Sequence, residues 1–157
     1  MIKQGGFTLI ELTIVIIILS VLAATAFFSW PATTLNLDGQ ANQIAADIQY
    51  AQTLSMTSGQ RYRFVKLSST TYQILNASGS TVSLYGRSTV TLNGNITFGT
   101  LTNLPNNLVA FDGEGSPYTD TGSPGTALAS TATINLSASG QTTTVSITPQ
   151  TGRVTVP

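Results

Sequence analysis

The chain has 157 residues, of which only 8% are charged, and its six basic and six acidic side chains give a formal net charge of zero. Typical soluble proteins carry about 25% charged residues, so this surface must be built mostly from neutral polar groups. The sequence contains no cysteine and no histidine, which excludes disulfides, Ser-His-Asp or Cys-His catalysis and a histidine-built zinc site. No basic excess exists to attract nucleic acid. We therefore interpret the chain as a non-enzyme and expect no cofactor.

A single acid lies at the start of a long apolar run. Glu11 is followed by residues 12–37, which carry no charge. The apolar stretch 12–28 is long enough to cross a bilayer, which requires about 20 residues. An ionised carboxylate is costly in hydrocarbon, so an acid at this place is a candidate functional residue.

Residues 6–12, Gly-Phe-Thr-Leu-Ile-Glu-Leu, resemble the class III signal of type IV pilins and type II secretion pseudopilins. The resemblance implies that a prepilin peptidase removes residues 1–6 as a leader by cutting between Gly6 and Phe7, and methylates the new amino terminus of Phe7. It also implies a transmembrane and assembly helix over residues 7–30. The partners would be the bilayer, an inner-membrane assembly platform and other subunits. The location would be the bacterial inner membrane, with a single pass and a periplasmic globular domain. After assembly, the chain would be part of an extracellular pilus or a periplasmic pseudopilus.

The chemistry of cleavage is consistent with this resemblance. Cutting after Gly6 creates an amino cation at Phe7, and Glu11 lies four residues on, one turn away on the same helix face. In hydrocarbon each charge needs the other or an equivalent partner. The amine could belong to the same subunit or to an adjacent one. The family is held to use the neighbour's amine to set register.

Two simpler interpretations compete with the pilin signal. An ordinary secretory signal peptide would use Lys3 as its positive region and residues 24–26, Ala-Thr-Ala, as its cleavage site. An acid inside the apolar region is poorly suited to such a peptide. A plain membrane anchor leaves Glu11 without a role.

A second helical stretch is predicted over residues 31–58. Pro31 lacks an N–H and should kink or interrupt the helix there. Beyond it, apolar residues recur at the i, i+3, i+4, i+7 spacing of an amphipathic helix, a stripe that we interpret as domain core. The stripe consists of Leu37, Ala41, Ile44, Ala45, Ile48 and Ala51. The polar side is predicted to hold Asn42, Gln43, Asp47 and Gln52.

Residues 59–157 have the pattern of short strands separated by turn residues. Strands are predicted at 61–67, 71–75, 81–85, 89–92, 96–98, 108–111, 133–137, 144–148 and 153–156. Residues 112–130 are rich in Gly, Pro, Ser and Thr and are predicted to form a long loop. A long helix packed on a small antiparallel β-domain, with two sheets, gives an α+β fold.

Residues 111–117, 134–136 and 145–154 resemble the GspH/FimT-type branch of the superfamily, which comprises minor pilins and minor pseudopilins. The resemblance implies two small β-sheets. It favours a minor pilin of a type IV pilus, at a priming or tip-proximal position. A minor pseudopilin of a type II secretion system is the alternative, and a tip module for DNA uptake or adhesion is a second alternative.

Arg61, Arg63 and Lys66 form the basic cluster of the sequence. Strand alternation puts Arg61 and Arg63 on one face and Lys66 on the other. Some FimT-like pilins bind DNA through a Gly-Arg-x-Arg element. Here Arg153 is present but the second arginine is Thr155. Arg61, Arg63 and Arg153 are therefore the candidate nucleic-acid contacts, and a solvated strand face is the favoured interpretation.

Asp112, Glu114 and Asp120 lie in or near a glycine-rich loop. Oxygen ligands at that spacing could hold calcium, as in some pseudopilins. The loop lacks the spacing and the bidentate glutamate of an EF-hand, so a hydrogen-bonded polar turn is favoured and no metal site is assigned.

Overall fold

The computed structural model describes residues 8–28 and 32–157. The chain divides into two compact units, Met1–Ala32 and Thr33–Pro157, and each is described by itself. Gly6, Phe7 and Pro31 lie outside the described residues. Leader cleavage, methylation and the kink therefore stay predictions.

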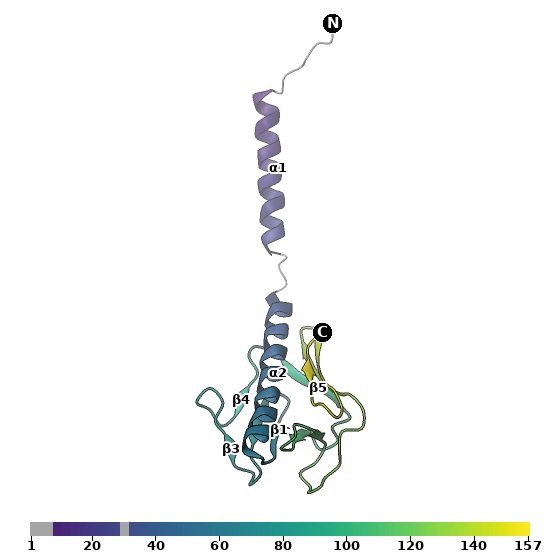
Figure 1. Ribbon diagram of the computed structural model, residues 1–157. Helices are drawn as coiled ribbons and strands as arrows, with labels where there is room; N and C mark the ends of the chain where they lie inside the picture. Colours follow the sequence, from purple (N-terminus) through teal and green to yellow (C-terminus); the bar gives the residue numbers. More distant parts are fainter. Residues whose placement is uncertain (1–7, 29–31) are drawn as a thin grey trace. The chain divides into compact units, whose positions relative to one another are not determined.

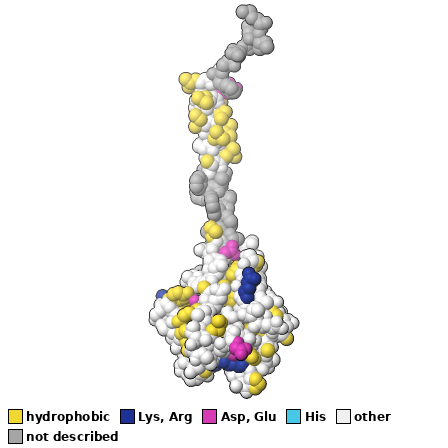
Figure 2. All heavy atoms as spheres, in the orientation of Figure 1, with side chains coloured by type: hydrophobic (Ala, Val, Ile, Leu, Met, Phe, Trp, Pro, Cys, Tyr) yellow, Lys and Arg dark blue, Asp and Glu magenta, His cyan; other side chains and the backbone are white. Residues whose placement is uncertain are grey.

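The first unit contains helix α1, Leu9–Phe28. From Leu9 to Leu22 its large apolar side chains are exposed on all faces, from 45% at Val15 to 83% at Leu9, and apolar groups appear along this helix in Figure 2. Within the described part of the chain, no helix has both the length and the hydropathy needed to span a membrane.

The second unit begins with helix α2, Ala32–Ser58, close to the predicted 31–58. The prediction of a core stripe is confirmed, because all six of its residues are buried at 7% exposure or less. The helix ends at Ser58 and is followed by Gly59, whose φ of 67° is readily adopted by a glycine. Its N–H donates to the carbonyl of Ser55 at 2.9 Å.

Ten short strands follow α2 and form two antiparallel sheets, so the predicted α+β fold is confirmed (Figure 1). The first sheet has the order β3-β2-β1-β6-β7, with β4 also paired to β2. The second has the order β10-β9-β8-β5. The strands are β1 Tyr62–Lys66, β2 Thr71–Leu75, β3 Thr81–Val82, β4 Val90–Thr91, β5 Thr97–Thr102, β6 Leu108–Phe111, β7 Pro117–Tyr118, β8 Ala132–Ala138, β9 Gln141–Ile147 and β10 Val154–Thr155.

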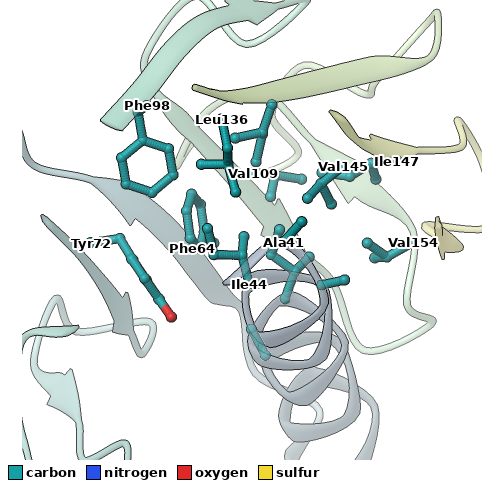
Figure 3. Close-up of a cluster of buried hydrophobic side chains, with 14 of the residues drawn as sticks. Ala41, Ile44, Phe64, Tyr72, Phe98, Val109, Leu136, Val145, Ile147 and Val154 are labelled. Atoms are coloured by element: carbon teal, nitrogen blue, oxygen red, sulfur yellow. The ribbon is translucent and has the colours of Figure 1, made fainter. Parts of the chain in front are cut away.

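One hydrophobic core joins α2 to both sheets (Figure 3). Phe64 of β1 is fully buried, and its ring centroid lies 5.1 Å from that of Tyr72 and 6.3 Å from that of Phe98. Val145 and Ile147 of the second sheet belong to the same cluster. Burying a large apolar side chain contributes about 1.5–3 kcal/mol, so this shared core holds the two sheets on one helix.

Several expected bounds are wrong in part, and two of them depend on pairing between distant segments. The predicted loop 112–130 contains β7, where Phe111 pairs with Pro117 and Ala110 with Tyr118. The predicted strand 96–98 is longer than expected, because β5 continues to Thr102 through a register shift between Phe98 and Leu101. Tertiary pairing decides both cases, and local alternation does not reveal it.

The placement of Asp47 on the polar side of α2 is also wrong. Its side chain is only 2% exposed. The Tyr72 hydroxyl donates to one carboxylate oxygen at 2.6 Å, and the Tyr85 hydroxyl donates to the other at 2.8 Å. Burial raises the pKa of Asp47, and the two hydrogen bonds partly oppose that shift. The carboxylate thus ties α2 to β2 and to the turn at Tyr85.

Candidate functional site

The start of α1 carries the candidate assembly residue. Glu11 lies exposed in the first turn, and its backbone N–H donates to the Thr8 carbonyl at 3.1 Å and to Thr8 Oγ1 at 3.3 Å. Thr8 therefore caps the helix, in a Thr-x-x-Glu arrangement typical of a capping box. The sequence interpretation missed this cap, although the spacing was available as a signal. Glu11 thus occupies both a capping position and the position predicted for charge pairing.

The rest of α1 provides a contact surface. A helix that is apolar on every face needs an apolar environment around it, supplied by lipid or by other helices. Ser20 and Thr13 are polar, but their hydroxyls donate back to the carbonyls of Ile17 and Leu9 within the helix. From Leu9 to Leu22, the surface of α1 therefore consists mainly of apolar side chains.

A cleft of about 510 Å³ lies beside the end of α2, and we call it the arginine cleft. It brings together two of the three predicted arginines, Arg61 and Arg63, with Asp112 in the same lining. Arg153 is not among the described residues that line it. The full lining is Gly59, Gln60, Arg61, Arg63, Ala77, Ala110, Asp112, Gly113, Thr121, Gly122 and Ser123.

Arg61 is engaged within the protein. Its guanidinium donates to the carbonyls of Gly122 and Pro124 and lies over the Tyr118 ring, with 4.0 Å between Cζ and the ring centroid. These contacts hold the segment 120–126 as one wall of the cleft. Arg61 is therefore a structural residue of the wall, which weakens its candidacy as a phosphate contact.

Arg63 differs from its neighbours. Within the described part of the chain, its guanidinium has no hydrogen bond and no ion pair. Lys66, predicted on the opposite strand face, lies with its Nζ 5.9 Å from the centroid of the Phe98 ring, on the core side. The predicted division of the two faces is thus confirmed.

The three acids of the candidate calcium loop lie in two turns, with Asp112 and Glu114 in the first and Asp120 in the second. Asp112 Oδ1 accepts the N–H groups of Glu114 at 3.0 Å and Ser116 at 2.9 Å. Asp120 accepts the N–H groups of Gly122 and Thr126 at 3.0 and 2.9 Å. In residues 8–28 and 32–157, no three acidic side chains gather where they could hold a metal ion. The two aspartates act as caps of polar turns.

Electrostatic effects at these turns agree with the hydrogen bonds. The pKa of Asp120 is lowered, first by a hydrogen bond from Thr126, and the Arg61 charge adds to the shift. The pKa of the Tyr118 hydroxyl is raised, first by its hydrogen bond to Asp112, while Arg61 acts in the opposite direction. The wall of the cleft is therefore a coupled network of Arg61, Tyr118 and the two aspartates.

The segments that resemble the GspH/FimT branch meet on α2. Gln52 Nε2 donates to the Gly115 carbonyl at 2.8 Å and to the Thr151 carbonyl at 2.9 Å. Gly152 has a φ of 62°, and a Cβ there would lie 2.6 Å from Gln52 Nε2. Gln52, predicted on the polar side, is thus a half-buried clamp between the turns of the two sheets.

Comparison with known families agrees with this architecture. The family described as "Type II transport protein GspH" matches residues 40–152, which is most of the chain. The chain belongs to this GspH family. The "Prokaryotic N-terminal methylation motif" also matches, over residues 1–27. The two matches together cover the proposed leader, α1 and nearly all of the second unit, and they support the interpretation of the chain as a minor pilin or pseudopilin of the GspH branch.

Two solved structures share the fold of this GspH-family chain. A crystal structure of the type IV minor pilin FimU from Pseudomonas aeruginosa matches with a TM-score of 0.59 and 18% identity, covering 80% of this chain and 90% of that chain. A second crystal form of FimU matches with a TM-score of 0.55 and 19% identity, covering 77% of this chain and 92% of that chain. A comparison with curated protein sequences gives no match.

Proposed function

We propose that this chain is a minor pilin, a structural subunit that joins a type IV pilus after a prepilin peptidase has removed residues 1–6 and methylated Phe7. The proposal is supported by membership of the GspH family, by the N-terminal methylation motif and by the likeness to a type IV minor pilin. The role is assembly, at a priming or tip-proximal position, and it involves no catalysis.

The observation that carries the proposal is Glu11 in the first turn of a helix whose apolar side chains are exposed on every face. Such a helix enters the inner membrane before assembly and packs among other helices in the filament. A carboxylate in that environment requires a cation within a few ångströms. The methylated amine at Phe7 supplies this cation, and pairing with the amine of an adjacent subunit fixes the register of the entering subunit.

Glu11→Gln tests charge pairing apart from capping. Glutamine can occupy the same position of a capping box, so the helix start is retained while the negative charge is lost. We expect intact-mass analysis to show normal leader removal and methylation, and we expect much less of the variant chain in sheared filaments.

Thr8→Val is the matched control, because it removes the cap but keeps the charge. We expect this variant to enter filaments far better than Glu11→Gln. Filaments that contain the Glu11→Gln chain at the wild-type level would refute charge pairing. A native chain that begins at Met1 or near Phe27 would refute processing as a pilin.

A second candidate is a minor pseudopilin of a type II secretion system, and membership of the type II transport protein GspH family favours it. The two machines can be separated by deletion of the gene and complementation. A pilus subunit appears in filaments sheared from the cell surface, and its loss reduces piliation. A pseudopilin stays in the periplasm, and its loss blocks protein secretion while piliation is unchanged.

A further inference from the structure

We propose that the arginine cleft binds an acidic side chain of the adjacent subunit in the filament, and that Arg63 is the residue that pairs with it. This inference rests on the proposed function, because it requires a neighbouring subunit. It adds a contact between heads to the packing of the N-terminal helices.

The cleft has a fixed wall and a free cation. Arg61 holds the wall through the carbonyls of Gly122 and Pro124 and is stacked on Tyr118. Arg63 lines the same space, and it has no hydrogen-bond or ion-pair partner in the part of the chain that the structure describes. A Cβ at Gly79 would lie 3.5 Å from an Arg63 guanidinium nitrogen, so that guanidinium lies against the turn after β2. Ordered surroundings therefore hold a guanidinium whose donors are unused.

Charge decides the class of ligand. Two guanidiniums, those of Arg61 and Arg63, are accompanied by two carboxylates, Asp112 in the lining and Asp120 beside Arg61. This balance leaves no positive excess for a run of phosphates, whose binding depends on several cations. One planar guanidinium with free N–H groups matches a single carboxylate. Asp112 does not fill this role, because no ion pair joins it to Arg63 among the described residues and its Oδ1 instead accepts two backbone N–H groups.

The position of a free carboxylate on this chain indicates which part of an adjacent subunit could enter the cleft. Asp38 lies exposed near the beginning of α2, and its carboxylate has no partner among the described residues. The cleft begins at Gly59, immediately after the helix ends at Ser58. Twenty residues of α-helix separate the two ends by about 30 Å. Free charges of opposite sign at the two ends of one helix suit a head-to-tail contact, which generates an open filament when repeated.

The occupant is therefore an acidic side chain that the next subunit presents at the start of its own second helix, and Asp38 is this chain's example of such a group. The space of about 510 Å³ is large enough to admit one side chain. A partner of this kind also suits a protein with so few charges, because each charged contact then has a large influence on register.

Arg63→Lys converts the proposed ion pair into one that can be trapped. A water-soluble carbodiimide activates a carboxyl group, the lysine amine attacks its carbonyl carbon, and an amide bond forms as the activating group leaves as a urea. The chain has only two other lysines, Lys3 in the proposed leader and Lys66, so the background is small. Sheared filaments and native membranes that contain the full mature chain are treated, and linked peptides are identified by mass spectrometry.

We expect a link from position 63 to an aspartate or glutamate of a second polypeptide. Arg87→Lys is the matched control, since Arg87 is exposed but does not line the cleft, and its yield should be several-fold lower. Wild-type chain gives the background of Lys66. Linkage from position 63 only to Asp112 of the same chain, or yields equal to that of Arg87→Lys, would overturn the inference.

A gel-shift assay with duplex DNA tests whether the cleft binds phosphate groups. If the wild-type chain binds the DNA and Arg63→Gln does not, the ligand of Arg63 is phosphate and not a protein carboxylate. That result would overturn the inference. The two proposals fail differently. A chain that is present in filaments without the link at position 63 refutes only the cleft contact. A chain that never reaches a filament refutes the proposed function, and the cleft contact is refuted with it.

Discussion

Replacing Asp47 with alanine should destabilise the second unit through one buried hydroxyl. Asp47 accepts hydrogen bonds from Tyr72 at 2.6 Å and Tyr85 at 2.8 Å. Tyr72 is fully buried, so its hydroxyl would lose its partner without access to water. Tyr85 is 68% exposed and can turn to solvent. An unsatisfied buried hydroxyl costs about 1–3 kcal/mol, and we expect the free energy of unfolding to fall by that amount.

The assay is urea unfolding of the detergent-solubilised chain, followed by near-ultraviolet circular dichroism of the buried tyrosine. Tyr85→Phe is the matched control, because it removes only the bond to the exposed hydroxyl, and it should cost less than Tyr72→Phe. Equal unfolding midpoints for Asp47→Ala and wild type would refute the reasoning. So would a larger loss for Tyr85→Phe than for Tyr72→Phe.

The same carboxylate gives a pH dependence whose sign follows from burial. Burial raises the pKa of Asp47 above its ordinary value of 3.8, so the folded chain binds this proton more readily than the unfolded chain. Stability therefore decreases as pH rises from about 3.8 through the folded pKa, and above it this contribution is constant. Asp47→Asn should remove this segment of the pH profile. A wild-type contribution that increases with pH over that window, and vanishes in Asp47→Asn, would contradict the burial argument.

Three further predictions concern single contacts at Gly152, Arg61 and Thr8, and those at Gly152 and Thr8 have a control substitution. Gly152→Ala places a Cβ 2.6 Å from a side-chain nitrogen of α2 at a φ of 62°, and should lower the free energy of unfolding by about 2 kcal/mol or more. Gly140→Ala, with a φ of 79° and no atom within 4 Å, should cost only about 1–2 kcal/mol. Arg61→Gln should accelerate hydrogen exchange in the segment 120–126, and unchanged exchange would contradict the wall contacts. Thr8→Val should reduce helix content at the start of α1 by circular dichroism, at about 1 kcal/mol for the cap, whereas Thr8→Ser should not.

The fold was predictable where one physical signal dominated. The spacing of Leu37, Ile44 and Ile48 specifies the buried face of α2, and the structure follows it. Asp47 lies three residues after Ile44 and four before Ala51, so the same spacing places it at the core. Its charge favoured a solvent-exposed position. Its two tyrosine partners come from distant segments, and no local sequence pattern indicates that they contact it.

The candidate sites were predictable only in part for a similar reason. Alternation correctly placed Arg61 and Arg63 on one strand face. The carbonyls that engage Arg61 belong to Gly122 and Pro124, about sixty residues away in a segment without periodicity. The two-residue strand β7 in that region exists because β6 offers a partner edge. Such contacts depend on tertiary placement, which local pattern does not encode.

The sequence segments that resemble the GspH branch make contacts within the fold, and these contacts explain them without a partner protein. Gln52 joins the turn at Gly115 to the turn at Thr151, and the glycines there admit its amide. A chain that keeps these turns keeps the two sheets on α2, whichever machine it serves. The choice between pilus and secretion machine must then be carried by surfaces outside this joint. The arginine cleft is one candidate for such a surface, because Arg63 lines it and makes no hydrogen bond or ion pair in the described part of the chain.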